Sequence, residues 1–413
     1  FGATLRLQSV ARQNFKTYSG FAMFYKNTAL LAILTLGFLL RLIVVLLVPD
    51  YFLFPDSKDY HIMAHNYIQG KDLIIFDTLY ATRPPLYSLF LAFLYSLGLD
   101  PLGALLVQVF LGTGMILCQY YLAILLFQNN SIALVSSLFL ALDPFFILFG
   151  ALLLTEILFS LLFLCLMFVL FKLRLSPKRL PWLYAGFLLG LGCLCRDALL
   201  GFMAFALFFS LRPPYALSKC LLLISGALLV IFPWTLRNWC YLNQVVLITS
   251  KKGTNLYEAF GPGATGGCAI MEMKLPEETE KMNEAEQDAF LTKWVLNHIL
   301  QNPQKAIELA WVKFVRFWNV SLNYEVLRKH PINLAIIAFS IVIYCLATVG
   351  FLLGEKKKIL LLLLPVFYFT LLHLVFLGSV RYRIPIMPYL EILASFGLVN
   401  LWKKYRIFMG HSS

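Results

Sequence analysis

The stretch "TALLAILTLGFLLRLIVVLLVP" (residues 28–49) decides the fold class, because it is long and apolar enough to cross a lipid bilayer. A helix needs about 20 predominantly apolar residues to span the hydrocarbon core. The composition of all 413 residues agrees: 60% are hydrophobic and only 13% are charged, whereas a soluble domain has about a quarter of its residues charged. The sequence therefore predicts an all-α polytopic membrane protein.

Nine further apolar windows follow the first one along the chain. The ten candidate transmembrane helices are 28–49, 103–127, 131–149, 157–172, 181–195, 198–211, 219–234, 332–352, 359–377 and 386–402. We expect one transmembrane domain over 28–402, flanked by a cytoplasmic segment (1–27) and a cytoplasmic tail (403–413). Its external loops are predicted at 50–102, 235–330 and 378–385. The first apolar run is long enough to span, so we expect no cleavable signal peptide.

Lysine and arginine set the expected orientation. With the N-terminal segment in the cytoplasm, every compact basic cluster falls on the cytoplasmic side; these clusters lie in 1–27, 172–179, 212–219, 356–358 and 403–406. This is the positive-inside pattern, and it places both termini in the cytoplasm. Membrane topology thus explains the net charge of +13. A nucleic-acid partner is not expected, because the chain has no soluble domain with a basic, aromatic-rich face.

The segment "FPDSKDYHIMAHNYIQG" (54–70) is conspicuously polar for one that directly follows a membrane helix. Its apolar spacing predicts an amphipathic helix over about 57–69 that stops at Gly70. Asp56 has two open interpretations: a helix N-cap, or a general base held at the membrane surface. His61 and His65 are four residues apart, but they lack the adjacent glutamate of the metalloprotease signature, so no metal site is predicted.

Other polar residues fall on the same external side. Arg83 precedes two prolines that begin a short helix at 82–98, Glu156 lies where a helix emerges, and arginines recur in "PWTLRN" (233–238) and "RYRIP" (381–385). A glutamate at that depth is costly unless it is paired or used. Each arginine either binds a phosphate through its guanidinium fork or reaches toward lipid headgroups.

Two further features concern helices. A second amphipathic helix is predicted from Pro303, and its apolar face would lie along the membrane surface; that face comprises Ile307, Trp311, Phe314, Val315 and Trp318. Arg41 lies in the middle of the first span, where it either pairs with an acid or reaches for water. The sequence does not decide between these two roles for Arg41.

Several short motifs occur in a recognisable order. They are Asp-Ser-x-x-Tyr-x-x-x-Ala-x-Asn at 56–66, Arg-Pro-Pro-Leu-Tyr at 83–87, Pro144 with Thr-Glu at 155–156, Pro-Trp-x-x-Arg-Asn at 233–238, Gly-x-Asn-Leu at 253–256 and Arg-Tyr-Arg-x-Pro-x-x-Pro at 381–388. This ordered set resembles the GT-C superfamily of integral-membrane glycosyltransferases. The likeness is to the bacterial branch similar to protein O-mannosyltransferases and the lipid A aminoarabinose transferase.

The chain departs from this pattern in two places. Asp197 follows Arg196 where the pattern has proline, which weakens a specific role for that turn. No large soluble domain follows the last span, which argues against an oligosaccharyltransferase of the large single-chain kind.

The resemblance implies an enzyme that moves one sugar, a hexose or a pentose, from a polyprenyl-phosphate donor, with inversion. The acceptor would be an envelope glycolipid, lipopolysaccharide or protein hydroxyl on the periplasmic face of a bacterial inner membrane. The resemblance makes Asp56 the catalytic base. It assigns the phosphate to Arg83, Arg381, Arg383 and Tyr382, and the orientation of sugar and acceptor to Glu156, Tyr60, Asn238 and Asn255. No cofactor is required, because a phosphate ester is already a good leaving group; a divalent metal is compatible with the resemblance, since some relatives bind one, but nothing in the sequence indicates it.

The main alternative is a polytopic transporter or flippase of lipid-linked sugars. Such a protein places ionisable groups or broken helices near the bilayer midplane, often in two related halves. Here most acids cluster outside, and no halves are evident. An inactive relative that serves as an assembly partner would be favoured if Asp56 or Glu156 were absent, but both are present.

Overall fold

The computed structural model describes residues 28–410 except 49, 77, 212 and 269–272. Across these described residues every regular element is a helix, and the only strand-like pairing is a single bridge between Ile75 and Leu79. The predicted all-α fold is therefore confirmed. The predicted cytoplasmic segment 1–27 and the last three residues of the tail lie outside the described part of the chain.

Seven helical stretches within the described residues are long and apolar enough to cross a membrane. They are α3 (Thr28–Leu47), α6 (Pro101–Phe127), α9 (Glu156–Arg174), α12 (Ala216–Leu242), α17 (Ile332–Leu353), α18 (Lys356–Val375), and the run of η4 (Val380–Ile386) into α19 (Met387–Gly410). This establishes a multi-pass membrane protein. The described part of the predicted tail 403–413 continues α19 as a helix to Gly410.

The predicted span 131–149 is a pair of helices, α7 (Asn130–Leu142) and α8 (Pro144–Gly150). The helix axis bends by 47° at the break between them. The break follows from two adjacent residues. Pro144 has no backbone N–H to continue the helical ladder, and the Asp143 carboxylate instead accepts from the backbone N–H of Phe145 at 2.7 Å. Counting this pair as one span gives eight candidates.

The expected count of about ten spans is not confirmed. The windows at 181–195 and 198–211 form α10 (Pro181–Cys195), η1 (Asp197–Leu199) and α11 (Phe202–Ser210). At 1.5 Å rise per residue, α10 and α11 are each shorter than the roughly 30 Å hydrocarbon core. The residues of the apolar window 181–195 pack partly against other helices of the bundle. Gly186 of α10, for example, lies directly against the α12 backbone.

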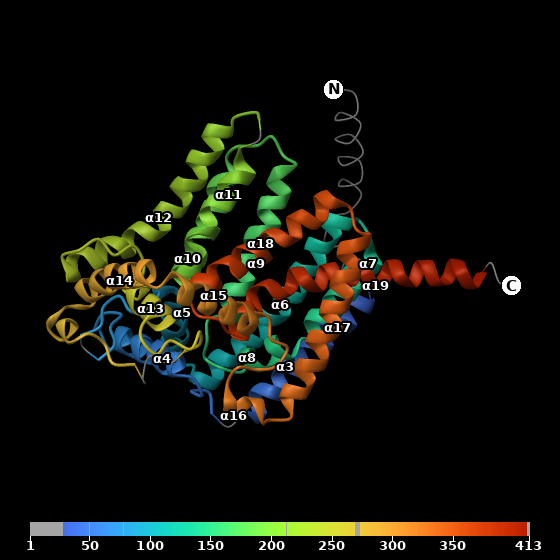
Figure 1. The fold of residues 1–413 in the computed structure, drawn as a ribbon. Coiled ribbons are helices and arrows are strands. Elements are labelled where there is room, and N and C mark those ends of the chain that lie inside the picture. Colours follow the sequence, from blue (N-terminus) through green and yellow to red (C-terminus); the bar gives the residue numbers. More distant parts are fainter. Residues whose placement is uncertain (1–27, 49, 77, 212, 269–272, 411–413) are drawn as a thin grey trace.

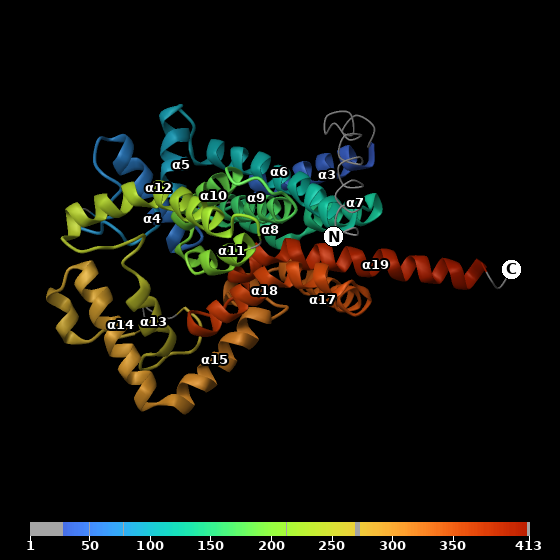
Figure 2. The same cartoon turned by 90° about the horizontal axis from the view of Figure 1, so that it is seen from above.

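The remaining helices belong to the predicted external loops. They are α4 (Pro55–Ile68), α5 (Pro85–Ser96), α13 (Lys252–Phe260), η3 (Glu277–Lys281), α14 (Glu284–Gln301), α15 (Pro303–Trp318) and α16 (Glu325–Arg328). In both views α4, α13 and α14 gather at one end of the molecule, while α19 runs out at the other (Figures 1 and 2). The 235–330 loop starts later than expected, because α12 continues through Pro233 to Leu242.

The second amphipathic helix is confirmed as α15, with Pro303 at its start. Much of its apolar face is not covered by the protein, since Ile307 is 71% and Trp311 is 65% exposed, whereas Phe314 and Trp318 are half-buried. An uncovered apolar face beside membrane helices is what an interfacial helix requires, and the location of α15 along the membrane surface stays a prediction.

Candidate active site

Asp56 lies one residue inside α4, not at its N-cap. The helix begins at Pro55 with Phe54 as N-cap, and it ends before Gly70, whose φ is +77°. The helix itself therefore agrees with the prediction, whereas the N-cap placement of Asp56 is wrong. Its carboxylate is engaged by arginine side chains instead, which leaves the functional interpretation of Asp56 in place.

Two arginines hold the two oxygens of the Asp56 carboxylate. Arg83 Nη2 lies 2.6 Å from Asp56 Oδ1, and Arg381 Nη1 lies 2.8 Å from Oδ2. Arg381 also donates through Nε to Oε1 of Glu156, which in turn lies 3.0 Å from Arg196 Nη2. Acids and arginines thus alternate in a connected network that joins α4, α9, η4 and the end of α10, and we call these five residues the carboxylate–arginine cluster.

Two partners in this region were missed by the sequence reasoning. Asp59 accepts from Arg83 Nε and Nη2 at 3.0 and 2.8 Å. It lies three residues after Asp56, so the helical spacing could have revealed it as a neighbour on the same face. The only sequence feature that pointed to Arg196 was its position in a polar external turn. Its contact with Glu156 depends on how α9 and α10 pack.

Burial differs sharply along the cluster. The side chain of Asp56 is 25% exposed, that of Arg381 is 12% exposed, and that of Glu156 is fully buried. The second oxygen of Glu156, Oε2, is buried and has no hydrogen-bond partner within the described residues. Asp56 therefore lies at the exposed side of the cluster. Glu156 lies at its buried side, where the oxygen Oε2 accepts no hydrogen bond from the described residues.

The neighbouring charges control the ionisation of Asp56. Burial alone would raise the pKa of Asp56, but the charges of Arg381 and Arg83 and the hydrogen bond from Arg381 outweigh burial, so its pKa lies well below the usual range. A depressed carboxyl pKa stabilises the folded protein above the unfolded-state pKa of about 3.9, and this contribution is lost as the pH falls through the folded-state pKa. Asp56 is thus a carboxylate at neutral pH.

Arg237 positions the loop that carries Arg83. Its Nε lies 3.1 Å from Asp72 Oδ2, and its Nη2 donates to Leu73 O at 3.1 Å. From the other side, Glu284 accepts the backbone N–H of Ala81 at 2.7 Å. The arginine of the "PWTLRN" motif therefore fixes a loop beside the cluster and does not itself contact Asp56 or Glu156.

Asn238 holds a second loop. It donates to Val246 O at 3.0 Å, while Trp234 Nε1 donates to Ile248 O at 2.8 Å. This loop ends at Lys251, whose pKa is lowered by burial and then by the charge of Arg83. Lys251 also helps to depress the pKa of Asp56, after Arg381 and Arg83, and the sequence reasoning missed this cation.

Tyr60 and Tyr382 lie beside the cluster. The Tyr60 ring is buried, and the Arg83 guanidinium lies 6.0 Å from its centroid. Tyr382 stacks on His373 with ring centroids 4.7 Å apart, and Arg196 lies 5.9 Å from the Tyr382 centroid. Both tyrosines can therefore line a ligand that contacts the arginines.

Arg383 and Asn255 are not brought into the cluster. Arg383 is fully buried and donates to the carbonyl oxygens of Phe317 at 3.0 Å and Asn319 at 2.7 Å. Asn255 lies half-buried on α13, where its backbone N–H bonds to Lys251 O at 2.9 Å. Among the described contacts, none joins either side chain to Asp56 or Glu156.

The histidine pair of α4 packs against an aromatic side chain. His61 Nδ1 lies 2.9 Å from the Tyr95 hydroxyl, and the His61 and His65 rings are 4.4 Å apart. Over the described part of the chain, no three His, Cys, Asp or Glu side chains are grouped as metal ligands.

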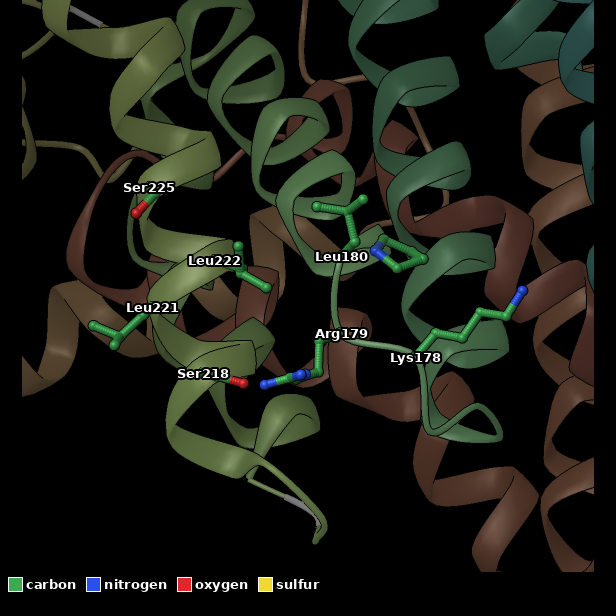
Figure 3. Close-up of a pocket in the computed structure, with 8 residues that line it drawn as sticks. Lys178, Arg179, Leu180, Ser218, Leu221, Leu222 and Ser225 are labelled. Atoms are coloured by element: carbon green, nitrogen blue, oxygen red, sulfur yellow. The ribbon is translucent and has the colours of Figure 1, made fainter.

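A surface groove of about 810 Å³ lies elsewhere, between the start of α10 and α12 (Figure 3). Lys178, Arg179, Ser218 and Leu222 are among its lining residues. Arg196 follows the opposite end of α10, so this groove is separated from the carboxylate–arginine cluster by the length of that helix. The groove is not part of the candidate active site.

A known family model matches part of the chain. Residues 82–236 match the family model described as dolichyl-phosphate-mannose-protein mannosyltransferase. The resemblance to GT-C glycosyltransferases is confirmed. The matched stretch contains Arg83, Glu156 and Arg196 of the cluster, and it supports a membrane glycosyltransferase of the GT-C type. Membership of the bacterial branch stays a prediction.

Solved structures of an archaeal oligosaccharyltransferase, AglB from Archaeoglobus fulgidus, are also similar. One, in complex with an inhibitory peptide and a dolichol-phosphate, is 12% identical, with 95% of this chain and 52% of that chain covered and a TM-score of 0.49. Another, tethered to an acceptor peptide, is 12% identical, with 94% and 51% covered and a TM-score of 0.49. This chain thus spans about half the length of those structures. No curated protein matches the chain at a significant level.

Proposed function

We propose that the protein transfers a single hexosyl or pentosyl group from a polyprenyl-phosphate donor to a hydroxyl of an envelope acceptor, with inversion, on the non-cytoplasmic side of a bacterial inner membrane. The observation that carries this proposal is the Asp56 carboxylate held between Arg83 and Arg381 at the end of a bundle of membrane helices. This arrangement supplies a base and two cations at one point, and the family match supports glycosyl transfer from a lipid phosphate.

The two arginines suit the donor phosphate. Guanidinium groups bind phosphate through paired N–H donors, and such charge-assisted hydrogen bonds are about twice as strong as neutral ones. In the structure these donors are taken up by Asp56 and its neighbours. A donor phosphate would compete for Arg83 and Arg381, while its polyprenyl chain stays among the membrane helices. These cations would then also stabilise the negative charge that builds on the phosphate as it leaves.

Donor binding would also activate Asp56. A carboxylate with a strongly depressed pKa is a weak base, so Asp56 is poorly basic while both arginines hold it. When the phosphate draws those arginines away, the pKa of Asp56 rises toward its ordinary value. Asp56 then accepts the proton of the acceptor hydroxyl as that oxygen bonds to the anomeric carbon, and the bond from that carbon to the phosphate oxygen breaks with its electron pair on the phosphate.

Glu156 is proposed to orient a hydroxyl of the sugar or acceptor. Its Oε1 is fixed by Arg196 and Arg381, whereas Oε2 has no donor within the described residues. A buried acceptor atom without a donor is costly, so a ligand hydroxyl at this position would restore a missing hydrogen bond. Tyr60 lies near Arg83, and Tyr382 lies near Arg196.

One observation favours the transporter alternative. Arg41, Asp143 and Glu391 are buried inside the helical bundle, and ionisable groups within membrane segments often mark a transport path. A transporter, however, leaves the bond between sugar and phosphate intact. The two functions are therefore distinguished by whether that bond breaks.

The proposed function is tested by the stereochemistry of its product. The purified protein in lipid vesicles is incubated with a panel of polyprenyl-phosphate hexoses and pentoses and an envelope extract. Mass spectrometry identifies the glycosylated acceptor, and nuclear magnetic resonance gives the configuration of the new bond. We expect inversion relative to the donor; retention would show that Asp56 is not simply a base, and movement of intact donor across the vesicle would identify a transporter.

Arg83→Gln is expected to change the pH dependence of kcat/KM, which reports ionisation in the free enzyme. The wild type should show no loss assignable to Asp56 as the pH falls to about 5, because its carboxyl pKa is depressed. Removing one arginine raises that pKa by about 1–3 units, so the loss of activity at acid pH begins at a higher pH. Arg328→Gln, at an exposed position on α16, is the control. The profiles are followed down to about pH 3, below the ordinary aspartate pKa of about 3.9, and identical acid limbs for wild type and Arg83→Gln over that range would contradict the assigned pairing.

A further inference from the structure

A second polar cluster lies inside the helical bundle and is not used by the proposed mechanism. It consists of Arg41 on α3, Gln119 on α6, Asp143 at the α7–α8 break and Glu391 on α19, all at most 2% exposed. Desolvated charges of this kind are expensive unless they are paired and hydrogen-bonded. The question is how three ionisable groups are accommodated there.

Arg41 is held by backbone carbonyls at the end of α7. Its Nη2 donates to Leu140 O at 2.8 Å, and its Nη1 donates to Ala141 O at 3.2 Å. The bend before Pro144 frees carbonyl groups of this kind, because the helical ladder stops there. On the α6 side there is little room to spare, since a Cβ built at Gly112 would lie 3.0 Å from Arg41 Nε. The guanidinium is thus built into the bundle and does not reach for water.

Each of the two acids accepts a hydrogen bond from a neutral donor on one of its oxygens. Asp143 Oδ1 accepts from the backbone N–H of Phe145 at 2.7 Å, and Glu391 Oε2 accepts from Gln119 Nε2 at 2.9 Å. The remaining oxygens, Asp143 Oδ2 and Glu391 Oε1, are buried with no donor among the described residues. Yet the two carboxyl side chains are within hydrogen-bonding contact of each other. Two adjacent carboxyl groups that are fully buried do not both ionise, because each charge raises the pKa of the other.

We propose that Asp143 and Glu391 share one proton, and that the single negative charge left on the pair is neutralised by Arg41. The shared proton supplies the one donor that both unpartnered oxygens lack. The result is a clamp that joins α3, α6, α19 and the α7–α8 bend within the bundle, and the charge of the buried Arg383 also acts on Asp143. Such a pair titrates as a unit, so the proton belongs to the pair and to neither acid alone.

The clamp also fixes the inner ends of two segments that carry the active-site cluster. One runs from Asp143 through α8 to Glu156, and the other runs from Arg381 through η4 to Glu391. Between these ends, Gln108 donates to Leu152 O at 3.0 Å and restrains the first segment again. Asp143 and Glu391 are therefore positioning residues for the Glu156–Arg381 pair, and this inference does not rest on the proposed reaction.

Infrared difference spectroscopy of the purified protein at neutral pH tests the shared proton directly. A protonated carboxyl group has a C=O stretching band distinct from that of a carboxylate. We expect this band in the wild type, and its loss in both Asp143→Asn and Glu391→Gln, because either amide leaves the other acid ionised beside Arg41. Glu284→Gln is the control for a different partly buried acid and should leave the band in place. A band unchanged by Asp143→Asn and Glu391→Gln would overturn the proposal.

Thermal unfolding provides a second test that needs no activity. Each single amide supplies the missing donor, so each should shift Tm only slightly. The double variant Asp143→Asn/Glu391→Gln leaves Arg41 without a counter-charge and should lose far more stability than the two single losses combined. Adding Arg41→Met to the double variant should recover part of that loss. Additive effects of the two amides, with no recovery from Arg41→Met, would show that the three residues do not share one charge balance.

Discussion

Asp56→Asn is expected to lower the turnover number for a polyprenyl-phosphate sugar by about 10²–10⁴-fold, the range that a positioned general base contributes. Asparagine keeps the size of the side chain but cannot accept the proton of the acceptor hydroxyl. Donor binding should survive, because the substitution also removes the carboxylate that competes with the phosphate for Arg83 and Arg381. The measurement is release of free polyprenyl phosphate, with donor affinity determined separately.

Asp59→Asn is the matched control for Asp56→Asn. Asp59 lies on the same helix, has a similar exposure, and shares Arg83 as its partner. Among the described residues, however, Asp59 pairs with Arg83 and makes no ion pair with Arg381, so it lies to one side of the proposed reaction. We expect at most about a tenfold loss for Asp59→Asn. Equal losses for the two variants would mean that Asp56 acts only through the placement of Arg83.

Arg381→Lys is expected to have the second largest effect. Arg381 uses Nη1 for Asp56 and Nε for Glu156 at the same time, and the single ammonium of lysine cannot reproduce that planar fork. We expect kcat to fall by about 10²–10³-fold, as when a donor that stabilises transition-state charge is removed. The measurement is turnover per folded protein, with folding checked by thermal unfolding. Arg381→Ala should also lose about 3–5 kcal/mol of stability, because it breaks a buried ion pair.

Arg383→Lys is the comparison that separates chemistry from folding. Arg383 lies two residues further on in η4, but its guanidinium donates to the carbonyl oxygens of Phe317 and Asn319. We expect Arg383→Lys to lower Tm while the turnover per folded protein stays within about tenfold of wild type. If Arg383→Lys reduced turnover as strongly as Arg381→Lys, the placement of the phosphate at Arg381 would be contradicted.

The sequence was sufficient to find the residue types of the cluster and the side of the membrane on which we expect them. The cost of a buried charge singles out Glu156, whereas the roles of Asp56, Arg83 and Arg381 come from the resemblance to GT-C enzymes. The structure brings these four together. It separates Arg383 from them, because the side chains of nearby residues in a tight helical segment such as η4 point in different directions. The residue types of a motif do not show where each side chain points.

Contacts between segments far apart in the sequence could not be predicted from the sequence alone. Arg196 meets Glu156 only because α10 packs beside α9, and Arg41 was left undecided between an acid and water because Asp143 and Glu391 come from distant segments. The number of spans was not confirmed, for a similar reason. An apolar window such as 181–195 predicts burial equally well in lipid or in the bundle, and length alone separates the two.

The most direct test of the account measures free polyprenyl phosphate released by the wild-type protein in lipid vesicles, with and without the envelope acceptor. We expect release to require the acceptor and to equal, mole for mole, the sugar found on it. No release from any donor in the panel, or release unaccompanied by a glycosylated acceptor, would contradict the assignment of Asp56 and its arginines to sugar transfer.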